Sequence, residues 1–447
     1  MLVPAVATAA RPLPSPQISR DTLRTAGAQH ATQVEPDTAS NGSTVVAAYQ
    51  VGRFFDGGSA AIGVSTSFNA GRTWTSQLLP GLTNATGSPT GAERATDPAV
   101  AYDAAHRRWL IESLTLMEDS SAIVVSGSLD ARTWDPPNTV IGRPYATGGD
   151  EGGTQLDKSW IACDNNASSQ FFGRCYVAYT DFSPPGVTIG VQSTDNGGIT
   201  WSNETFVPVS TDVPGVQPVV SANGQLVLLY IDAPGRVYAV RSNDGGASFA
   251  PREVIADVQI HRRPFSPNTL RNFPIATAAV DGAGTIYVAW PDCRFRARCA
   301  GNDIVVAHSS AAGWSAPRPI RVPGLRASAD HGIPGLGVDE RTSGAHAHLA
   351  VTFYTVNTAN CATAACRIDV RMATSVNGGA TWRRPVRLNT TAMPLSWLAR
   401  TVSGYMVGDY VGTSFAAGRA VGVYALARRP AGGRLNESIN AAARLVR

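Results

Sequence analysis

Short apolar runs recur along the chain, and each is followed by a polar turn sequence and a second, more polar run. Small or polar residues alternate with branched apolar residues within these runs, which is the period-two pattern of β-strands. Six runs show the pattern most clearly: AAIGVST (60–66), SAIVVSG (121–127), GVTIGVQ (186–192), RVYAVR (236–241), DIVVAH (303–308) and RIDVRMA (367–373). The pattern predicts an all-β protein.

A repeated turn sequence follows these runs. Its form is Ser/Thr-x-Asp/Asn-x-Gly-x-Thr/Ser-Trp/Phe, and it occurs four times, at Ser67–Trp74, Thr194–Trp201, Ser242–Phe249 and Ser375–Trp382. Shorter copies stand at Ser128–Trp134 and Ser309–Trp314, so that successive copies begin 48 to 67 residues apart. An Asp or Asn side chain can accept hydrogen bonds from the backbone that follows it, and Gly supplies a positive φ. Four residues are therefore predicted to hold β-hairpin turns: Asn69, Asn196, Asp244 and Asn377.

This turn resembles the Asp box of the sialidase superfamily (bacterial neuraminidase repeat proteins), and the resemblance covers roughly residues 30–428. It implies a β-propeller of four-stranded antiparallel blades. Innermost strands are expected to begin near Gln33, Asp97, Lys158, Gln217, Phe273, Gly332 and Met406. This count favours seven blades, with six as the alternative because sialidases themselves have six. The expected division is a signal-like remnant and N-terminal segment (1–30), a single propeller (31–430) and a C-terminal tail (431–447).

Charge and hydropathy exclude two kinds of partner. Charged residues make up 16% of the chain and the formal net charge is +4, with Lys158 as the only lysine. No basic run interleaves with aromatic residues, so nucleic acid is not an expected partner. No stretch of about 18 apolar residues is present, so no membrane span is expected. A monomer that binds a glycan or polysaccharide is the expected state, without a cofactor or metal.

The six cysteines fall into three close pairs, Cys163/Cys175, Cys293/Cys299 and Cys361/Cys366. The first pair lies on two successive predicted strands, where antiparallel pairing brings side chains within disulfide range. A metal site is the rival interpretation, but no histidine accompanies a pair at ligand spacing. Three local disulfides indicate an oxidising, extracellular compartment. The apolar start, Leu2 to Ala10, resembles the end of a signal peptide.

The resemblance places ligand sites on the propeller face opposite the Asp boxes, around the central channel. Residues reach that face from the start of each first strand and the end of each second strand. Arginine binds carboxylates in bidentate fashion, and a nearby acid can protonate a glycosidic oxygen. The candidate catalytic residues are Asp97, Asp292, Lys158 and Tyr405, and the candidate substrate-binding residues are Arg53, Arg94, Arg271, Arg294, Arg296 and Arg400.

Each candidate also has a structural interpretation. Asp97 can bond the ends of strands, and the Asp157–Lys158 pair can brace two blades. Arg294 and Arg296 can belong to a disulfide-closed surface loop.

Sialidases bind the substrate carboxylate with three arginines, the first in an Arg-Ile-Pro motif, and use an Asp and a Tyr/Glu pair. This chain has no Arg-Ile-Pro; its nearest echoes are Arg271-Asn-Phe-Pro and Ile333-Pro334. The family's triad and Tyr/Glu pair are therefore not transferred to numbered positions. A secreted sialidase-like glycoside hydrolase acting on terminal or acidic sugars is the leading hypothesis. A non-catalytic carbohydrate- or protein-binding propeller and a polysaccharide lyase are the alternatives.

Overall fold

The computed structural model describes residues 13–145, 156–183, 186–209, 213, 215–233, 235–261, 266, 268–359, 361 and 365–447. The apolar start, Leu2 to Ala10, lies outside this part of the chain. The described residues form an all-β structure of antiparallel sheets, and the helical content is four short 3-10 turns. These turns are η1 (Asn84–Thr86), η2 (Ala297–Cys299), η3 (Gly344–His346) and η4 (Leu395–Trp397). No described helix has the length and apolar character that crossing a membrane would require.

The strands follow one another in hairpin-connected groups. The first two groups are β1 (Gln29–Asn41), β2 (Thr44–Arg53), β3 (Ser59–Ser67) and β4 (Thr75–Leu78), then β5 (Arg94–Asp103), β6 (Arg108–Leu116), β7 (Ser120–Ser128) and β8 (Asn138–Pro144). The third and fourth are β9 (Leu156–Cys163), β10 (Cys175–Asp181), β11 (Thr188–Thr194) and β12 (Thr205–Pro208), then β13 (Val216–Val220), β14 (Leu226–Ile231), β15 (Arg236–Ser242) and β16 (Glu253–Asp257).

The remaining groups continue this order. They are β17 (Thr277–Val280), β18 (Ile286–Asp292), β19 (Asp303–Ser310), β20 (Gly313–Trp314) and β21 (Arg318–Ile320), then β22 (Asp330–Val338), β23 (Leu349–Val356), β24 (Ile368–Ser375) and β25 (Val386–Arg387). A hairpin of β26 (Ala399–Thr401) and β27 (Gly404–Met406) precedes the last group, β28 (Gly412–Ala416), β29 (Arg419–Ala427) and β30 (Glu437–Leu445).

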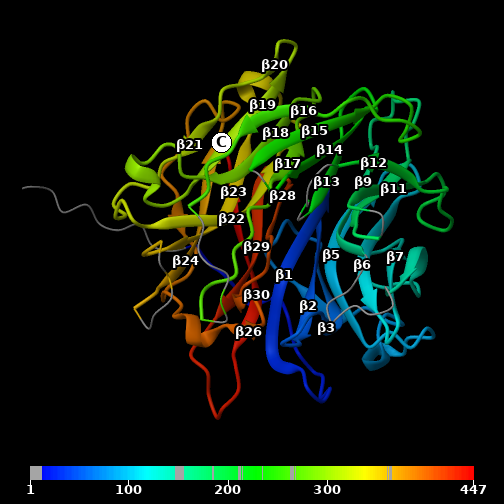
Figure 1. Ribbon diagram of the computed structural model, residues 1–447, viewed down its shortest axis with the longest axis horizontal. Coiled ribbons are helices and arrows are strands. Elements are labelled where there is room, and N and C mark those ends of the chain that lie inside the picture. The colour runs from blue at the N-terminus through cyan, green and yellow to red at the C-terminus, as the bar shows by residue number, and fades with distance from the viewer. Residues whose placement is uncertain are drawn as a thin grey trace, which may run out of the picture.

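The first strand of each group lies innermost. These strands contact one another in the order β1, β5, β9, β13, β17, β22 and β28, and β28 in turn contacts β1. Figure 1 shows the C-terminal strands β29 and β30, in red, beside the N-terminal strand β1, in blue. A cavity of about 670 Å³ is lined by residues of all seven of these innermost strands. The strands therefore surround a common central channel.

The apolar core occupies the spaces between neighbouring sheets. Val46 and Ile62 of the first group, for example, pack in one cluster with Val100 and Ile111 of the second, and all four are buried. Burying one such branched side chain contributes roughly 1.5–3 kcal/mol. This sheet-on-sheet packing explains why alternating apolar runs suffice to specify the groups.

The four residues predicted to hold turns do so. Asn69 Oδ1, for example, accepts hydrogen bonds from the backbone N–H groups of Arg72 (3.1 Å) and Thr73 (2.9 Å). Asn196, Asp244 and Asn377 make the corresponding bonds four residues on, at 3.0, 2.9 and 2.9 Å. Each turn joins the third and fourth strands of its group, at the end where the first strand also turns back into the second.

All three predicted disulfides are present: Cys163–Cys175, Cys293–Cys299 and Cys361–Cys366. Cys163 and Cys175 stand directly opposite each other in the pairing of β9 with β10. This position confirms the reasoning from two successive strands, because directly opposed side chains of an antiparallel pair lie within disulfide reach.

The two ends of the chain meet in the last group. Ile18 donates its backbone N–H to Ile439 of β30 (2.8 Å), and Ala441 donates to the carbonyl of Pro16 (3.1 Å). Residues 15–19 thus run along the outer edge of β30. The C-terminal residues 431–447, expected as a tail, contain β30, which pairs along its whole length with β29.

Candidate functional site

A local backbone feature brings charged side chains together at one end of the channel. Glu35, Asp97 and Lys158 lie on β1, β5 and β9 with positive φ values of 56°, 49° and 49°. At each of them the pairing with the neighbouring strand shifts register, which marks a β-bulge. Bulges re-aim side chains, and proline, which cannot donate to the ladder, follows Glu35 and Asp97. The side chains of Glu35, Asp97 and Lys158 consequently lie close together, instead of following the regular alternation between the two faces of a strand.

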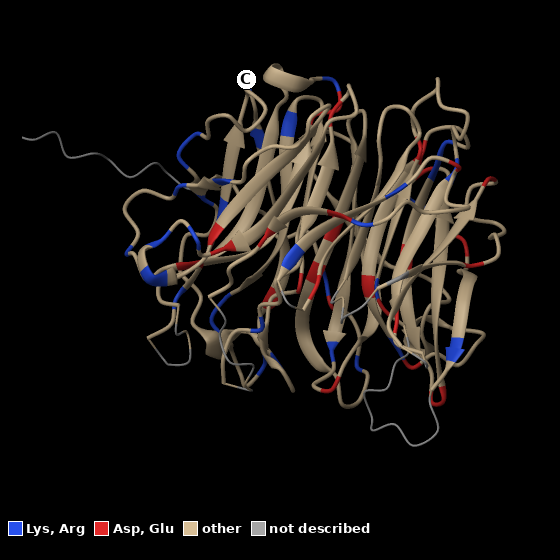
Figure 2. Ribbon diagram, turned by 45° about the horizontal axis from the view of Figure 1, so that its top comes forward, with Lys and Arg blue, Asp and Glu red and all other residues tan. Residues whose placement is uncertain are grey.

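Lys158 is the centre of the cluster. Its Nζ lies 2.9 Å from Asp97 Oδ1, 3.2 Å from Glu35 Oε1 and 2.8 Å from Asp409 Oδ2. We call the group formed by Glu35, Asp97, Lys158, Asp409 and Arg271 the lysine cluster. Figure 2 shows basic and acidic segments meeting near the middle of the molecule as well as along its loops.

Arg271 holds Asp409 from the other side. Its Nε and Nη2 donate to the two carboxylate oxygens of Asp409 at 2.7 and 2.5 Å, a bidentate pair. Gly408 permits this arrangement, because its φ is +131° and a Cβ there would lie 2.6 Å from Glu35 Cα. The backbone N–H of Asp409 can therefore also donate to Glu35 Oε1 (3.1 Å).

A second layer connects the cluster to β2. Gln50 donates to Glu35 and to Thr96 Oγ1 (2.9 Å), and it accepts a hydrogen bond from Arg53 Nη1 at 2.9 Å. Arg53 is 4% exposed, and its Nε has no hydrogen-bond partner among the described residues. A buried donor without a partner is costly, and it is the kind of group that a bound ligand can satisfy.

Burial and charge move the pKa values of the carboxyl groups in opposite directions. Burial raises the pKa of Glu35 above its ordinary value, although Lys158 opposes this shift. Burial also raises the pKa of the half-buried Asp157 to about 7, against the pull of Lys158. For Asp409 burial acts in the same sense, but Arg271 and Lys158 outweigh it and hold the pKa well below its usual range. Separated pKa values in one site are what acid–base chemistry requires.

The lysine ammonium is stabilised by its surroundings. Burial would lower the pKa of Lys158, but Asp409, Asp97 and Glu35 raise it well above the ordinary value. Lys158 therefore remains charged and fills the space between three carboxyl groups.

Among the described residues, no group of three or more His, Cys, Asp or Glu side chains is arranged to hold a metal ion.

An aromatic pair separates this cluster from the large cavity. Trp160 and Tyr410 meet edge to face with ring centroids 4.6 Å apart, and the Tyr410 hydroxyl donates to the Pro98 carbonyl (3.0 Å). Trp160 lines the cavity, whereas Lys158, two residues earlier on β9, belongs to the cluster. The cluster thus lies toward the end of the channel opposite the hairpin turns, the end at which the resemblance places ligand sites.

The structure brings together four of the predicted site residues and places the others elsewhere. Asp97, Lys158, Arg53 and Arg271 lie in or against the lysine cluster. Asp292 instead accepts hydrogen bonds from Trp290 Nε1 (3.2 Å) and Arg294 Nε (2.9 Å). Arg296 is engaged by Asp303 and by backbone carbonyl groups. These contacts give Asp292, Arg294 and Arg296 a local bracing role.

The remaining candidates lie near the cluster without joining it. Arg94 pairs with Asp56 at 2.6 Å and stacks over the Phe54 ring. Tyr405 lies on β27, where its carbonyl accepts from the backbone N–H of Arg271 (2.8 Å), and the Arg400 guanidinium lies 5.8 Å from its ring centre. Their participation in a site remains a prediction.

Sequence reasoning missed Asp409, which holds the position closest to both Lys158 and Arg271. It stands in the MVGDYVG segment at the entry to β28, where the chain offers no turn motif. Gly408 precedes it, but Val34, Thr96 and Asp157 precede the three bulge residues, so the sequence holds no shared signal for Asp409.

A scan against protein-family models finds no match for the chain, and neither does a search of curated proteins. Solved structures do resemble it. The BP39L lectin from Burkholderia pseudomallei aligns with TM-score 0.54 and 13% identity over 94% of this chain and 96% of the lectin. A protein of unknown function from Dyadobacter fermentans aligns with TM-score 0.51 and 13% identity over 98% and 99%.

The Hadza microbial sialidase Hz136 aligns with TM-score 0.50 and 14% identity over 94% of this chain, which spans 66% of the sialidase. At these identities the similarity establishes the fold alone. The chain therefore shares the β-propeller fold of solved neighbours that include a lectin and a sialidase.

Proposed function

We propose that the chain is a secreted, sialidase-like glycoside hydrolase that acts on an acidic sugar at the lysine cluster. The observation that carries this proposal is the displacement of carboxyl pKa values in opposite directions at one place, upward at Glu35 of the lysine cluster and at the adjoining Asp157, and downward at Asp409. Such pairs supply the general acid and the ionised carboxylate that glycoside hydrolysis uses.

Asp157 is the proposed general acid. It is half-buried, whereas Glu35 is fully buried, and its pKa of about 7 keeps the proton available near neutral pH. Asp97 is the proposed second carboxyl group of the mechanism, held in place by Lys158. Arg53, with its unpartnered Nε, is the proposed contact to the sugar carboxylate, and Arg271 fixes Asp409.

The same proposal extends to the whole chain. The innermost strands and their cyclic contacts support a closed ring of seven blades, with residues 15–19 as the outer strand of the last blade. The propeller then spans about residues 13–446, beyond the expected limits of 31–430. The three disulfides support an extracellular location, and a monomer remains the expected state.

A non-catalytic glycan-binding propeller is the second candidate. Lys158 already pairs with the three buried carboxyl groups, a saturated arrangement that suits a rigid binding site as well as a catalytic one. The similarity to the BP39L lectin over nearly the full length of both chains favours the same interpretation.

The test is a screen of sialosides and uronate-containing polysaccharides that records product mass together with near-ultraviolet absorbance. Hydrolysis is expected to give a new reducing end without absorbance. Asp157→Asn and Asp97→Asn should each lower the rate by roughly 10²–10⁴-fold, the usual contribution of general acid–base catalysis. Asp195→Asn, at an exposed turn aspartate, is the matched control and should leave the rate unchanged.

The pH dependence gives a second readout. Because Asp157 must be protonated to act as an acid, the rate should fall as the pH rises through about 7. An absorbing product would indicate an eliminative lyase, and saturable binding without any product would favour the binding propeller. A rate that Asp157→Asn leaves intact would remove this residue from the mechanism.

A further inference from the structure

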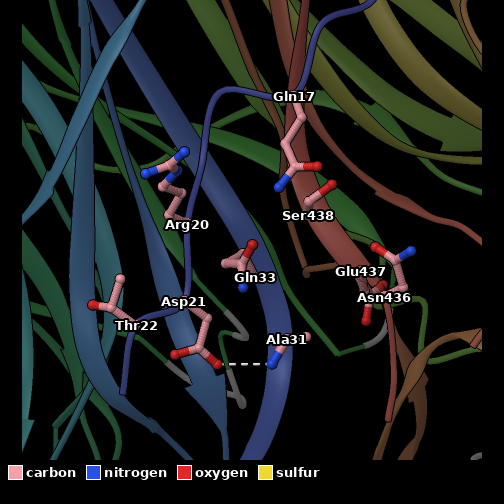
Figure 3. Close-up of a pocket in the computed structure, with 9 residues that line it drawn as sticks. All are labelled: Gln17, Arg20, Asp21, Thr22, Ala31, Gln33, Asn436, Glu437 and Ser438. Atoms are coloured by element: carbon pink, nitrogen blue, oxygen red, sulfur yellow. Dashed lines mark hydrogen bonds between the residues drawn. The ribbon is translucent and has the colours of Figure 1, made fainter. Parts of the chain in front are cut away.

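A second cavity lies apart from the lysine cluster, where the N-terminal segment crosses the starts of β1 and β30. Its volume is about 360 Å³. Figure 3 shows its lining, which apart from Ala31 consists of polar side chains: Gln17, Arg20, Asp21, Thr22, Gln33, Asn436, Glu437 and Ser438. Cavities that bind small molecules begin at about this size, although most have a more apolar lining.

Glu437 is the unusual member of this lining. Glu437 is 1% exposed, and its Oε2 accepts a hydrogen bond from the backbone N–H of Ala399 at 2.8 Å. Its Oε1 is buried and has no hydrogen-bond partner among the described residues. Burial also raises the pKa of Glu437 well above the ordinary value, which favours the protonated form of the carboxyl group. Such a group can both donate and accept a hydrogen bond.

The other charged residues narrow the class of ligand. Both oxygens of Asp21 are engaged, Oδ1 by the backbone N–H of Leu23 (2.9 Å) and Oδ2 by that of Ala31 (2.7 Å) and by His30. Because both oxygens of Asp21 already accept hydrogen bonds and burial disfavours the ionised form of Glu437, the cavity offers little to a cation. Arg20 is an exposed residue and is the one basic side chain among the described residues that line the cavity, so an anion would meet one solvated charge.

We propose that this cavity binds one neutral sugar unit through its hydroxyl groups. Sugar hydroxyl groups can donate to the unpartnered Glu437 Oε1, and the amide and hydroxyl side chains of Gln33, Asn436 and Thr22 offer both donors and acceptors to them. The site is distinct from the lysine cluster, although Gln33 and Glu35 both lie on β1. It does not rest on the proposed hydrolysis.

The experiment measures binding of D-galactose, D-glucose, N-acetylglucosamine and, as the charged comparison, inorganic phosphate to the full chain by ligand-observed NMR and thermal shift. At least one neutral sugar should bind saturably and raise the melting temperature. Asn436→Ala and Thr22→Val should each weaken that sugar at least fivefold. Thr90→Val, at an exposed threonine outside the cavity, and Asp97→Asn, in the lysine cluster, should not weaken it.

Each other outcome overturns the proposal. Saturable binding of phosphate alone would mean that Arg20 defines an anion site. Sugar binding that Asp97→Asn abolishes and Asn436→Ala leaves intact would belong to the lysine cluster. If none of the neutral sugars binds saturably, the cavity is a water-filled space without a sugar ligand. Loss of hydrolysis in the screen above does not bear on these results, so the two proposals fail separately.

Discussion

Lys158 stabilises the fold by compensating the charge of the buried carboxyl groups around it. Three carboxyl groups lie within 3.2 Å of its Nζ, and Glu35, Asp97 and Asp409 are each no more than 1% exposed. Lys158→Met removes the charge that compensates them but keeps the apolar stem. Removing one partner of a buried ion pair costs about 3–5 kcal/mol, because an uncompensated charge remains buried.

Urea unfolding at pH 7 should therefore show a loss of about this size for Lys158→Met. The loss should shrink at lower pH, since the carboxyl groups left behind can take up protons. Arg236→Met is the matched control, because Arg236 forms an exposed pair with Asp257. Such pairs contribute about 0–1 kcal/mol. Equal losses in the two variants would mean that Lys158 is not holding a buried cluster.

Glu437 should make stability depend on pH in the opposite sense to an ordinary salt-bridged acid. Its pKa is raised in the folded state, so the folded protein holds a proton that the unfolded chain releases above about pH 4.5. Stability is then lost as the pH rises through the interval between the unfolded and folded pKa values. Glu437→Gln keeps the shape and the bond from Ala399 but cannot ionise. Its melting temperature should exceed that of the original protein at pH 8 and equal it at pH 4.

At the scale of single elements, the turns and the bulges differ in how far sequence could predict them. The turn at Asn69 depends on hydrogen bonds within five residues, so its sequence determines it. The bulge at Lys158 depends on pairing with β10 and on carboxyl groups from β1, β5 and the approach to β28. Sequence could name Asp97 and Lys158 as candidates. It could not show that Asp409, which follows Lys158 by 251 residues, completes their cluster.

The ends of the chain show the same limit. The nine-residue strand β30 (Glu437–Leu445) lies where the sequence analysis expected a C-terminal tail, and its sequence ESINAAARL has no alternation of apolar and polar residues that would predict a strand. The segment around Ile18 lies along the outer edge of β30 and bonds Ile439, which is 421 residues away in sequence. No pattern of residues around Ile18 predicts this pairing. Long-range closure of this kind is set by the geometry of the whole molecule rather than by any single segment.

At the scale of the whole molecule, the N-terminal segment stabilises the last group of strands by covering its edge. Ile18 is 4% exposed, its N–H bonds Ile439 at 2.8 Å, and its carbonyl accepts from Ser65 Oγ on β3 at 2.5 Å. The segment therefore joins the last group to the first. An edge strand without such a cover exposes unpaired backbone groups and invites aggregation.

Ile18→Ala should consequently weaken the whole fold rather than fray one end. Truncation of a buried isoleucine to alanine costs about 2–5 kcal/mol, and the midpoint of cooperative urea unfolding should fall accordingly. Val402→Ala, at a valine that is 51% exposed, is the control and should change stability by less than about 0.5 kcal/mol. If the ends close the ring, hydrogen exchange should quicken in both β30 and β3 of the Ile18 variant. Faster exchange in β30 alone would mean that the segment covers an edge without connecting the first group to the last.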